Sequence, residues 1–329
     1  MRAIVVEQYG GPEALRLTDV TAPTPGGDQV SIAVQAAAVG LIDVLFRRDG
    51  LGGLVPVPFI PGIEVAGRIL EVGDDVEGLT PGQPVVTLSR PGTSGYAEIV
   101  VVPASVVLPL DDDSGPIAPD TAVAGIPNVV TALAALDDAA RLRAEDEVLV
   151  LGATGGLASV FPSVAKALGA GRVTGAVSRA GSVERALALG YDDVLLTDEL
   201  PHTAARFDVI VDPVGGASRV AALSLLQPLG RLIAVGNASD AEQVLVGTND
   251  LWLSNTGVVG LNIAALLEAR PQRVRSLAAR AIDLVRAGAV IVPVESLPLE
   301  QAAEAHRRLE SREAVGRIVL TPVTSERRL

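Results

Sequence analysis

The chain has 329 residues, of which 49% are apolar, and its formal net charge is −13 at pH 7. This length predicts two domains, and the acidic balance argues against partners that present phosphate backbones or anionic lipid. The sequence contains no cysteine and two histidines, which excludes disulfide bonds, thiolate metal sites and a histidine cluster for zinc. We therefore expect no bound metal, no nucleic acid and no membrane among the partners.

The first 110 residues alternate short apolar segments with turns rich in glycine and proline, a pattern typical of antiparallel β-structure. We predict strands at residues 3–6, 15–19, 30–38, 63–72, 84–88 and 96–102. The acidic run at residues 111–113 predicts a solvated loop. The N-terminus lacks the pattern of a signal peptide, and the apolar stretch 118–136 contains Asp120, Asn128 and prolines, so we expect a cytoplasmic protein.

From about residue 121 the pattern changes to helices that alternate with short branched strands, which predicts a doubly wound parallel sheet in an α/β fold. The expected strands are residues 147–151, 172–177, 194–196, 207–211, 231–235 and 258–261, and the expected helices are 157–168, 182–189 and 217–229. The tail should form a helix at 273–287, a strand at 290–293, a helix at 299–309 and a strand at 316–320. We expect this tail to complete the first domain, which gives one domain of residues 1–122 with 265–329 and another of residues 123–264.

A turn of small residues connects the strand 147–151 to the helix that follows it. Its spacing, G-x-x-G-x-x-A, ends at Ala158 and is a variant of the dinucleotide fingerprint, in which small residues let a pyrophosphate approach backbone amides. The candidate cofactor-binding residues here are Gly152, Ala153, Thr154, Gly155, Gly156 and Leu157. An ordinary strand-to-helix turn is the alternative. Pro162 should kink the helix unless the first turn ends there.

The end of the next strand distinguishes the two nicotinamide cofactors. An acid at this position binds the ribose hydroxyls of NAD, whereas basic or hydroxyl residues accept the 2′-phosphate of NADP. Strand 172–177 ends in Ser178 and Arg179, and the next carboxylate is Glu184. We therefore predict NADPH as the cofactor, with a solvated surface arginine as the alternative role of Arg179.

Seven segments in order resemble those of the zinc-free, zeta-crystallin-like quinone oxidoreductases of the medium-chain dehydrogenase/reductase superfamily. They are GPE at 11–13, PGIEVAG at 61–67, GYAE at 95–98, GIP at 125–127, the glycine turn at 152–158, DPVGG at 212–216 and EAH at 304–306. The resemblance implies a GroES-like β-rich catalytic domain and a Rossmann domain that binds NADPH. It also implies a homodimer and small-molecule substrates, namely quinones or α,β-unsaturated carbonyl compounds.

The same resemblance places several polar residues along the nicotinamide edge. These are Asn128, Thr131, Asn237 with its neighbour Gly236, and Asn262; each of the polar ones has a capping or turn role as its alternative. We take Asn128 and Thr131 as candidate catalytic residues and Gly236, Asn237 and Asn262 as candidate cofactor-binding residues.

The segment at residues 40–47 departs from the family pattern. It lacks the usual asparagine, and Phe46 stands near the position of a substrate-facing tyrosine. We list Phe46 and Asp43 as candidate catalytic positions, with a structural role as the alternative for Asp43. Tyr96 is expected to serve packing, and His306, next to Arg307 and Arg308, is predicted to lie on the surface.

The predicted activity is hydride transfer from NADPH to quinones or α,β-unsaturated carbonyl compounds without a metal, in class EC 1.6.5 or 1.3.1. Two alternatives remain open. One is an enoyl-thioester reductase of a biosynthetic pathway. The other is a catalytically weak NADPH-binding relative with a structural or regulatory role.

Overall fold

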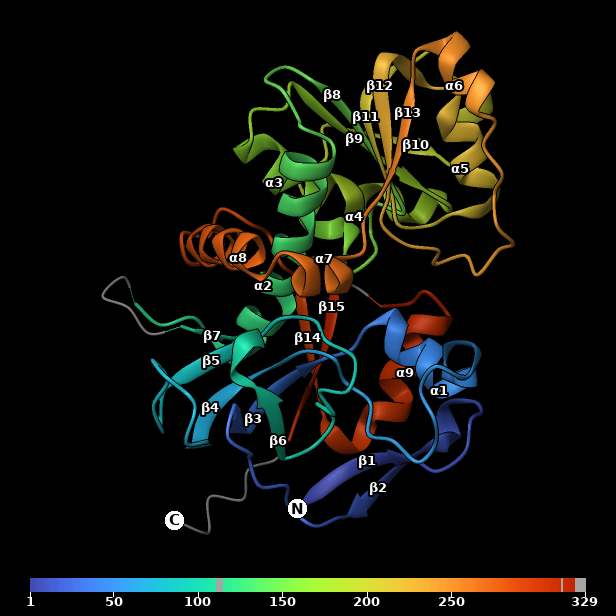
Figure 1. Ribbon diagram of the computed structural model, residues 1–329. Helices are drawn as coiled ribbons and strands as arrows, with labels where there is room; N and C mark the ends of the chain where they lie inside the picture. Colours follow the sequence, from blue (N-terminus) through green and yellow to red (C-terminus); the bar gives the residue numbers. More distant parts are fainter. Residues whose placement is uncertain (111–114, 315, 323–329) are drawn as a thin grey trace. The chain divides into compact units, whose positions relative to one another are not determined.

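The computed structural model describes residues 1–110, 115–314 and 316–322, and the chain divides into two compact units (Figure 1). The first unit is Met1–Pro127 with Val292–Leu329, and the second is Asn128–Ile291. The acidic run predicted as a loop at residues 111–113 lies outside the described residues. Each unit has its own sheet, as the change of pattern near residue 121 predicts.

The first unit contains an antiparallel pair, β1 (Arg2–Val6) with β2 (Leu15–Asp19), and a seven-stranded sheet in the order β14-β15-β3-β4-β5-β7, with β6 paired to β3. The strands of the larger sheet are β3 (Gln29–Ala38), β4 (Val65–Val72), β5 (Pro84–Thr87), β6 (Ile99–Pro103), β7 (Val107–Pro109), β14 (Val294–Pro298) and β15 (Arg317–Thr321). Strand β15 pairs antiparallel with β3, so the tail of the chain completes the first sheet, as expected.

The first unit contains helical segments from both ends of the chain. They are η1 (Pro12–Ala14), α1 (Leu41–Gly53), η2 (Ala104–Val106), η7 (Leu299–Gln301) and α9 (Ala302–Glu310). Helices α1 and α9, blue and red in Figure 1, lie side by side. The strand predicted at 290–293 is wrong, because Val294 is the residue that pairs with Arg317 at the start of β15.

The second unit is built on a parallel six-stranded sheet in the order β10-β9-β8-β11-β12-β13. Its strands are β8 (Glu147–Leu151), β9 (Arg172–Val177), β10 (Asp193–Leu196), β11 (Phe207–Asp212), β12 (Leu226–Ala234) and β13 (Gly257–Gly260). Counted along the chain, this order is 3-2-1-4-5-6, the doubly wound order of dinucleotide-binding folds. Its central strands are buried apolar runs, as a sheet covered on both faces requires.

Helical segments surround this sheet. They are α2 (Pro119–Leu133, in the second unit from Asn128), η3 (Ala134–Ala139), η4 (Ala158–Val160), α3 (Phe161–Ala167), η5 (Ala180–Ser182), α4 (Val183–Ala188), η6 (Leu200–His202), α5 (Gly216–Leu223), α6 (Thr248–Ser254), α7 (Ile263–Ala269) and α8 (Pro271–Arg286). By length and composition alone, the stretch Pro119–Ala139 could cross a membrane, but 78% of its apolar 18-residue window is buried inside the fold, as in a core helix.

Two further details differ from the sequence-based expectations, and Pro162 follows the exception stated for it. The helix predicted at 217–229 ends at Leu223, because Leu226 already pairs with Phe207 and Pro228 has no amide to continue a helix. Pro162 lies in the first turn of α3, where proline is tolerated. Helices α7 and α8 belong to the second unit, whereas the boundary predicted at residue 264 places them in the first domain.

Ion pairs connect α8 to η3 of the second unit. Arg273 binds Asp138 with an Nε–Oδ distance of 3.0 Å, and Arg280 binds Asp137 at 2.6 Å. Both aspartates lie in η3, directly after α2. Ion pairs therefore tie α8 to a segment of the second unit.

Candidate functional site

The glycine turn after β8 requires residues without side chains. Gly152 has a φ of +64°, in the left-handed region, and a Cβ added there would lie 2.8 Å from Cγ2 of Val214. The amide of Gly155 donates to the carbonyl of Gly152 at 2.8 Å, and the amide of Ala153 donates to Ala176 of β9 at 3.0 Å. The turn is thus fixed to β9 by a hydrogen bond. It lies at the carboxyl edge of the sheet, next to the point between β8 and β11 where the strand order reverses.

Two side chains orient the peptide that follows Gly156. Nδ2 of Asn128 and the hydroxyl of Ser159 each donate to the carbonyl of Gly156 at 2.9 Å. Because the peptide bond is trans, the amide of Leu157 points away from that carbonyl. The side chain of Asn128 is buried in this role, and Thr131, three residues further along α2, is also buried. The structure therefore brings Asn128 to the glycine turn.

Ser178 and Arg179 follow β9 at the same edge of the sheet, and both are exposed. The carbonyl of Arg179 accepts from the amide of Ser182 at 2.9 Å, and the hydroxyl of Ser182 accepts from Nη2 of Arg185 at 2.8 Å. Among the residues that the structure describes, none forms a hydrogen bond or ion pair with the guanidinium of Arg179. Arg179 thus offers an exposed cation at the carboxyl end of β9.

The remaining candidates of the second unit lie in loops after β12 and β13. Gly236 and Asn237 are exposed, and Nδ2 of Asn237 donates to the carbonyl of Ala241 at 2.9 Å. Asn262 is the N-cap of α7, because its Oδ1 accepts from the amides of Ala264 and Ala265 at 3.0 and 3.2 Å. For Asn262 the capping alternative is therefore observed.

Asp43 and Phe46 lie on α1 of the first unit and are both enclosed. Oδ2 of Asp43 accepts from the amide of Gly40 and Oδ1 from the amide of Gly62, each at 2.9 Å. Burial raises the pKa of Asp43 to about 7 in spite of these two donors. The side chain of Phe46 is 5% exposed. Both side chains face the interior of the first unit in this structure.

The prediction that His306 lies on the surface is wrong. Its side chain is fully buried, and its Nε2 lies 3.1 Å from the hydroxyl of Tyr96, with the two rings edge to face. Burial, together with the nearby charge of Arg47, lowers the pKa of His306 to about 3, so the ring is neutral. The charged neighbours misled the prediction, but Ala302, Ala305 and Leu309 lie on the same helical face as His306 and mark it as buried.

Two ion pairs in the first unit, one buried and one partly buried, were not anticipated. Arg47 is 1% exposed and binds Glu310 of α9, with Nη2 at 2.6 Å from Oε1. Arg317 of β15 binds Glu64, whose other oxygen accepts from the hydroxyl of Ser89. Each pair joins the N-terminal part of the chain to its tail. Local sequence patterns do not indicate contacts between residues so far apart in the chain.

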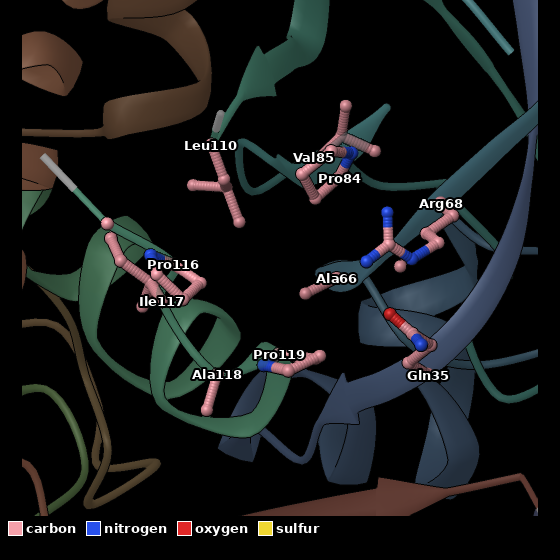
Figure 2. Close-up of a pocket in the computed structure, with 12 residues that line it drawn as sticks. Gln35, Ala66, Arg68, Pro84, Val85, Leu110, Pro116, Ile117, Ala118 and Pro119 are labelled. Atoms are coloured by element: carbon pink, nitrogen blue, oxygen red, sulfur yellow. The ribbon is translucent and has the colours of Figure 1, made fainter. Parts of the chain in front are cut away.

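The first unit also contains a pocket that is lined by none of these residues. Figure 2 shows a pocket of about 620 Å³ between strands β3, β4 and β5 and residues 115–119. Its walls are mainly apolar, and Nη1 of Arg68 at its side donates to the carbonyl of Gly82 at 2.8 Å. It contains none of the predicted site residues. Among the described residues, no group of three or more acidic or histidine side chains is placed to hold a metal ion.

Comparisons with known proteins cover both units. Residues 26–112 match the model of the alcohol dehydrogenase GroES-like domain, and residues 189–320 match that of the zinc-binding dehydrogenases. The quinone oxidoreductase of Mus musculus is 30% identical over 317 residues, 93% of each chain. The synaptic vesicle membrane protein VAT-1 homolog of Homo sapiens is 25% identical over 98% of this chain and 86% of its own. A mycobacterial protein solved in complex with NADPH is 28% identical, with a TM-score of 0.87 over 98% of this chain and 100% of its own.

Proposed function

The chain belongs to the quinone oxidoreductase family of the medium-chain dehydrogenase/reductase superfamily, and we propose that it transfers hydride from NADPH to quinones or α,β-unsaturated carbonyl compounds without a metal. As a member of this family, the protein is an oxidoreductase of the superfamily. The choice of NADPH is supported by the NADPH complex of the mycobacterial relative and by the residues at the sheet edge.

The observation that carries the cofactor assignment is the exposed guanidinium of Arg179 beside Ser178. A 2′-phosphate carries negative charge and accepts hydrogen bonds, and these two residues offer a cation and a hydroxyl at the carboxyl end of β9. A carboxylate, which would hold the ribose hydroxyls of NADH, is absent from both positions. NADPH is therefore expected to bind more tightly than NADH.

The glycine turn fits the pyrophosphate of such a cofactor. Gly152 leaves no side chain between the ligand and the backbone, and the carbonyl of Gly156, held by Asn128 and Ser159, turns the amide of Leu157 outward. We propose that Asn128 acts here as a positioning residue for the cofactor. Thr131, Asn237 and Asn262 remain candidates for contacts along the nicotinamide.

When bound, NADPH supplies a hydride, and the acceptor must also gain a proton. Phe46 has no proton to donate, and the carboxyl of Asp43 is held by two backbone amides inside the first unit. We propose that water provides the proton, a route open to quinones because the dihydroquinone anion can leave the site before it is protonated. An enone or enoyl thioester needs a proton at carbon, so quinones are the better substrates for this site.

A weakly catalytic NADPH-binding protein is the second candidate function, favoured by Phe46 at the position where the family resemblance places a tyrosine. The discriminating experiment measures NADPH and NADH oxidation with a panel of quinones, alkenals and enoyl thioesters. Turnover of quinones supports the reductase. Quenching of NADPH fluorescence without turnover of any acceptor selects the weakly catalytic alternative.

The cofactor assignment has its own test in Arg179→Glu. The reversed charge repels a 2′-phosphate, so the affinity for NADPH should fall about 100-fold while that for NADH changes little. Fluorescence titration measures both dissociation constants. Arg206→Glu is the matched control, since Arg206 is exposed and precedes β11 at the opposite edge of the sheet. An equal loss for both cofactors would remove Arg179 from the 2′-phosphate site.

We also propose that the protein acts as a cytoplasmic homodimer formed through the second unit. Among the described strands, β13 ends the six-stranded sheet. Large apolar side chains near it are exposed, including Leu229 at 78%, Trp252 at 74% and Leu253 at 71%. Such a patch on a soluble domain typically marks a protein interface. Light scattering at several concentrations measures the mass, and a constant monomer mass would contradict the homodimer.

A further inference from the structure

A buried ion pair connects the two loops that follow β11 and β12. Asp212 ends β11 and has no exposed surface; its Oδ1 accepts from the amides of Val214 and Gly215 at 2.8 and 2.9 Å. Its Oδ2 accepts from Nε of Arg219, a residue of α5. Nη2 of the same guanidinium donates to the carbonyl of Gly236, after β12, at 2.7 Å. One arginine therefore holds both loops.

The two loops are also in close contact through their backbones. The amides of Val235, Ala238 and Ser239 donate to the carbonyls of Asp212, Pro213 and Val214 at 2.9 to 3.0 Å. Gly215, with a φ of +79°, allows Asn237 to approach, since a Cβ at Gly215 would lie 2.2 Å from Oδ1 of Asn237. The two loops are thus joined by three backbone hydrogen bonds and by the close approach at Gly215.

The location of this link in the sheet indicates which part of a dinucleotide it serves. A doubly wound sheet consists of two mononucleotide-binding halves, one on each side of the point where the strand order reverses. That point lies between β8 and β11, with the glycine turn and Arg179 on the side of β8 and β9. Asp212, Arg219 and Gly236 lie on the other side, which takes the nicotinamide half when the first half takes the adenosine.

We propose that Arg219, through its bridge between Asp212 and Gly236, is a positioning residue that fixes the loops bearing Gly215 and Asn237 in the shape that receives the nicotinamide half of the cofactor. This inference rests on the proposed NADPH function. The fork of a guanidinium suits the role, because it reaches a carboxylate and a carbonyl at once, whereas the ammonium of lysine is a point charge. The carboxylate of Asp212 holds the loop after β11, and Arg219 holds the loop after β12.

The test separates the two halves of the ligand. Adenosine 2′,5′-bisphosphate carries the adenosine half and the 2′-phosphate but no nicotinamide, and NADPH carries both. Arg219→Lys keeps a cation for Asp212 but lacks the second donor arm that reaches Gly236. We expect its dissociation constant for NADPH to rise about 10-fold, in line with a lost charge-assisted hydrogen bond, and that for adenosine 2′,5′-bisphosphate to stay within about twofold of wild type.

Arg219→Met removes the bridge and the charge, and Arg206→Met is its matched control. If Arg219→Met unfolds, Arg219→Lys carries the test, with its melting temperature measured alongside. Equal weakening of both ligands in Arg219→Lys, or no weakening of either, overturns the positioning role. A wild-type protein that binds neither ligand overturns the proposed function and this inference with it, whereas intact wild-type binding with an unselective variant overturns the inference alone.

Discussion

Polar side chains gather in two places, and they differ in what remains for a ligand. In the first unit, Asp43 is bound by two amides, Tyr96 and His306 pair with each other, and these three side chains are fully buried. At the carboxyl edge of the second unit's sheet, glycines and an exposed Arg179 face outward. In the first cluster, the polar groups bind backbone amides or one another inside the unit, and these contacts serve the fold. At the second place, the backbone of the turn is fixed but its surface is exposed, as expected of a site that completes its contacts with a ligand.

Gly152→Ala is the change that should damage the open site most. Alanine would have to adopt the left-handed backbone conformation of Gly152, and its Cβ would lie 2.8 Å from Cγ2 of Val214. Left-handed backbone costs an L-residue about 1–2 kcal/mol, and the contact adds to it, so we expect NADPH affinity to fall about 100-fold. Fluorescence titration measures the loss. Gly257→Ala, where an added Cβ meets no atom within 4 Å, is the control and should bind normally.

His306→Gln probes the closed cluster through pH. The pKa of His306 is lowered to about 3 in the fold, whereas the unfolded chain takes up this proton below about pH 6.5. The stability that neutral His306 contributes is therefore fully present above pH 6.5 and is lost as the pH falls. Asp43 acts in the opposite sense, because its raised pKa favours the fold at low pH, up to about 7.

Comparison of wild type with His306→Gln cancels the contribution of Asp43, which both proteins contain. Relative to the variant, the wild type should lose about 1.4 kcal/mol of unfolding free energy per pH unit below 6.5. Urea unfolding between pH 7.5 and 5 measures the difference. His202→Gln, at the exposed end of η6, is the control. If the difference in unfolding free energy between wild type and variant does not change with pH, His306 takes up protons in the fold as readily as in the unfolded chain.

Asn128→Leu should have the smallest effect on the open site. The carbonyl of Gly156 keeps the hydroxyl of Ser159 as a donor, so the amide of Leu157 is less firmly oriented but not released. We expect NADPH affinity to fall about fivefold, as for one neutral hydrogen bond. Ser159→Ala should act similarly, and the double variant more than the product of the two. Strictly multiplicative losses would contradict a shared role at Gly156.

The fold followed from the sequence where local patterns decide it. Strands β8 and β9 begin and end at the predicted residues, because each is an apolar run bounded by turns. The prediction failed where pairing decides: β12 begins at Leu226 because Phe207 lies opposite, and β14 begins at Val294 because Arg317 does. Neither partner is visible from the local sequence.

The candidate site divides in the same way. The spacing of the glycines predicted the turn, and Ser178 with Arg179 lies at the end of β9, as expected. By contrast, the bridge from Arg219 to Gly236 and the bond from Asn128 to Gly156 join different loops and follow no sequence spacing. His306 carried a usable signal in the apolar face of α9, which its charged neighbours outweighed.

The tail of the chain also sets an order of assembly during synthesis. Residues 37 and 38 of β3 pair with β15, and Arg47, Glu64 and Tyr96 find their partners in residues 306–317. A nascent chain leaves the ribosome from its N-terminus, so the second unit has all its residues before the first can close. Until then this edge of β3 lacks its strand partner and is open to pairing with another chain. Synthesis of β15 is thus the step that gives this edge of β3 its partner strand.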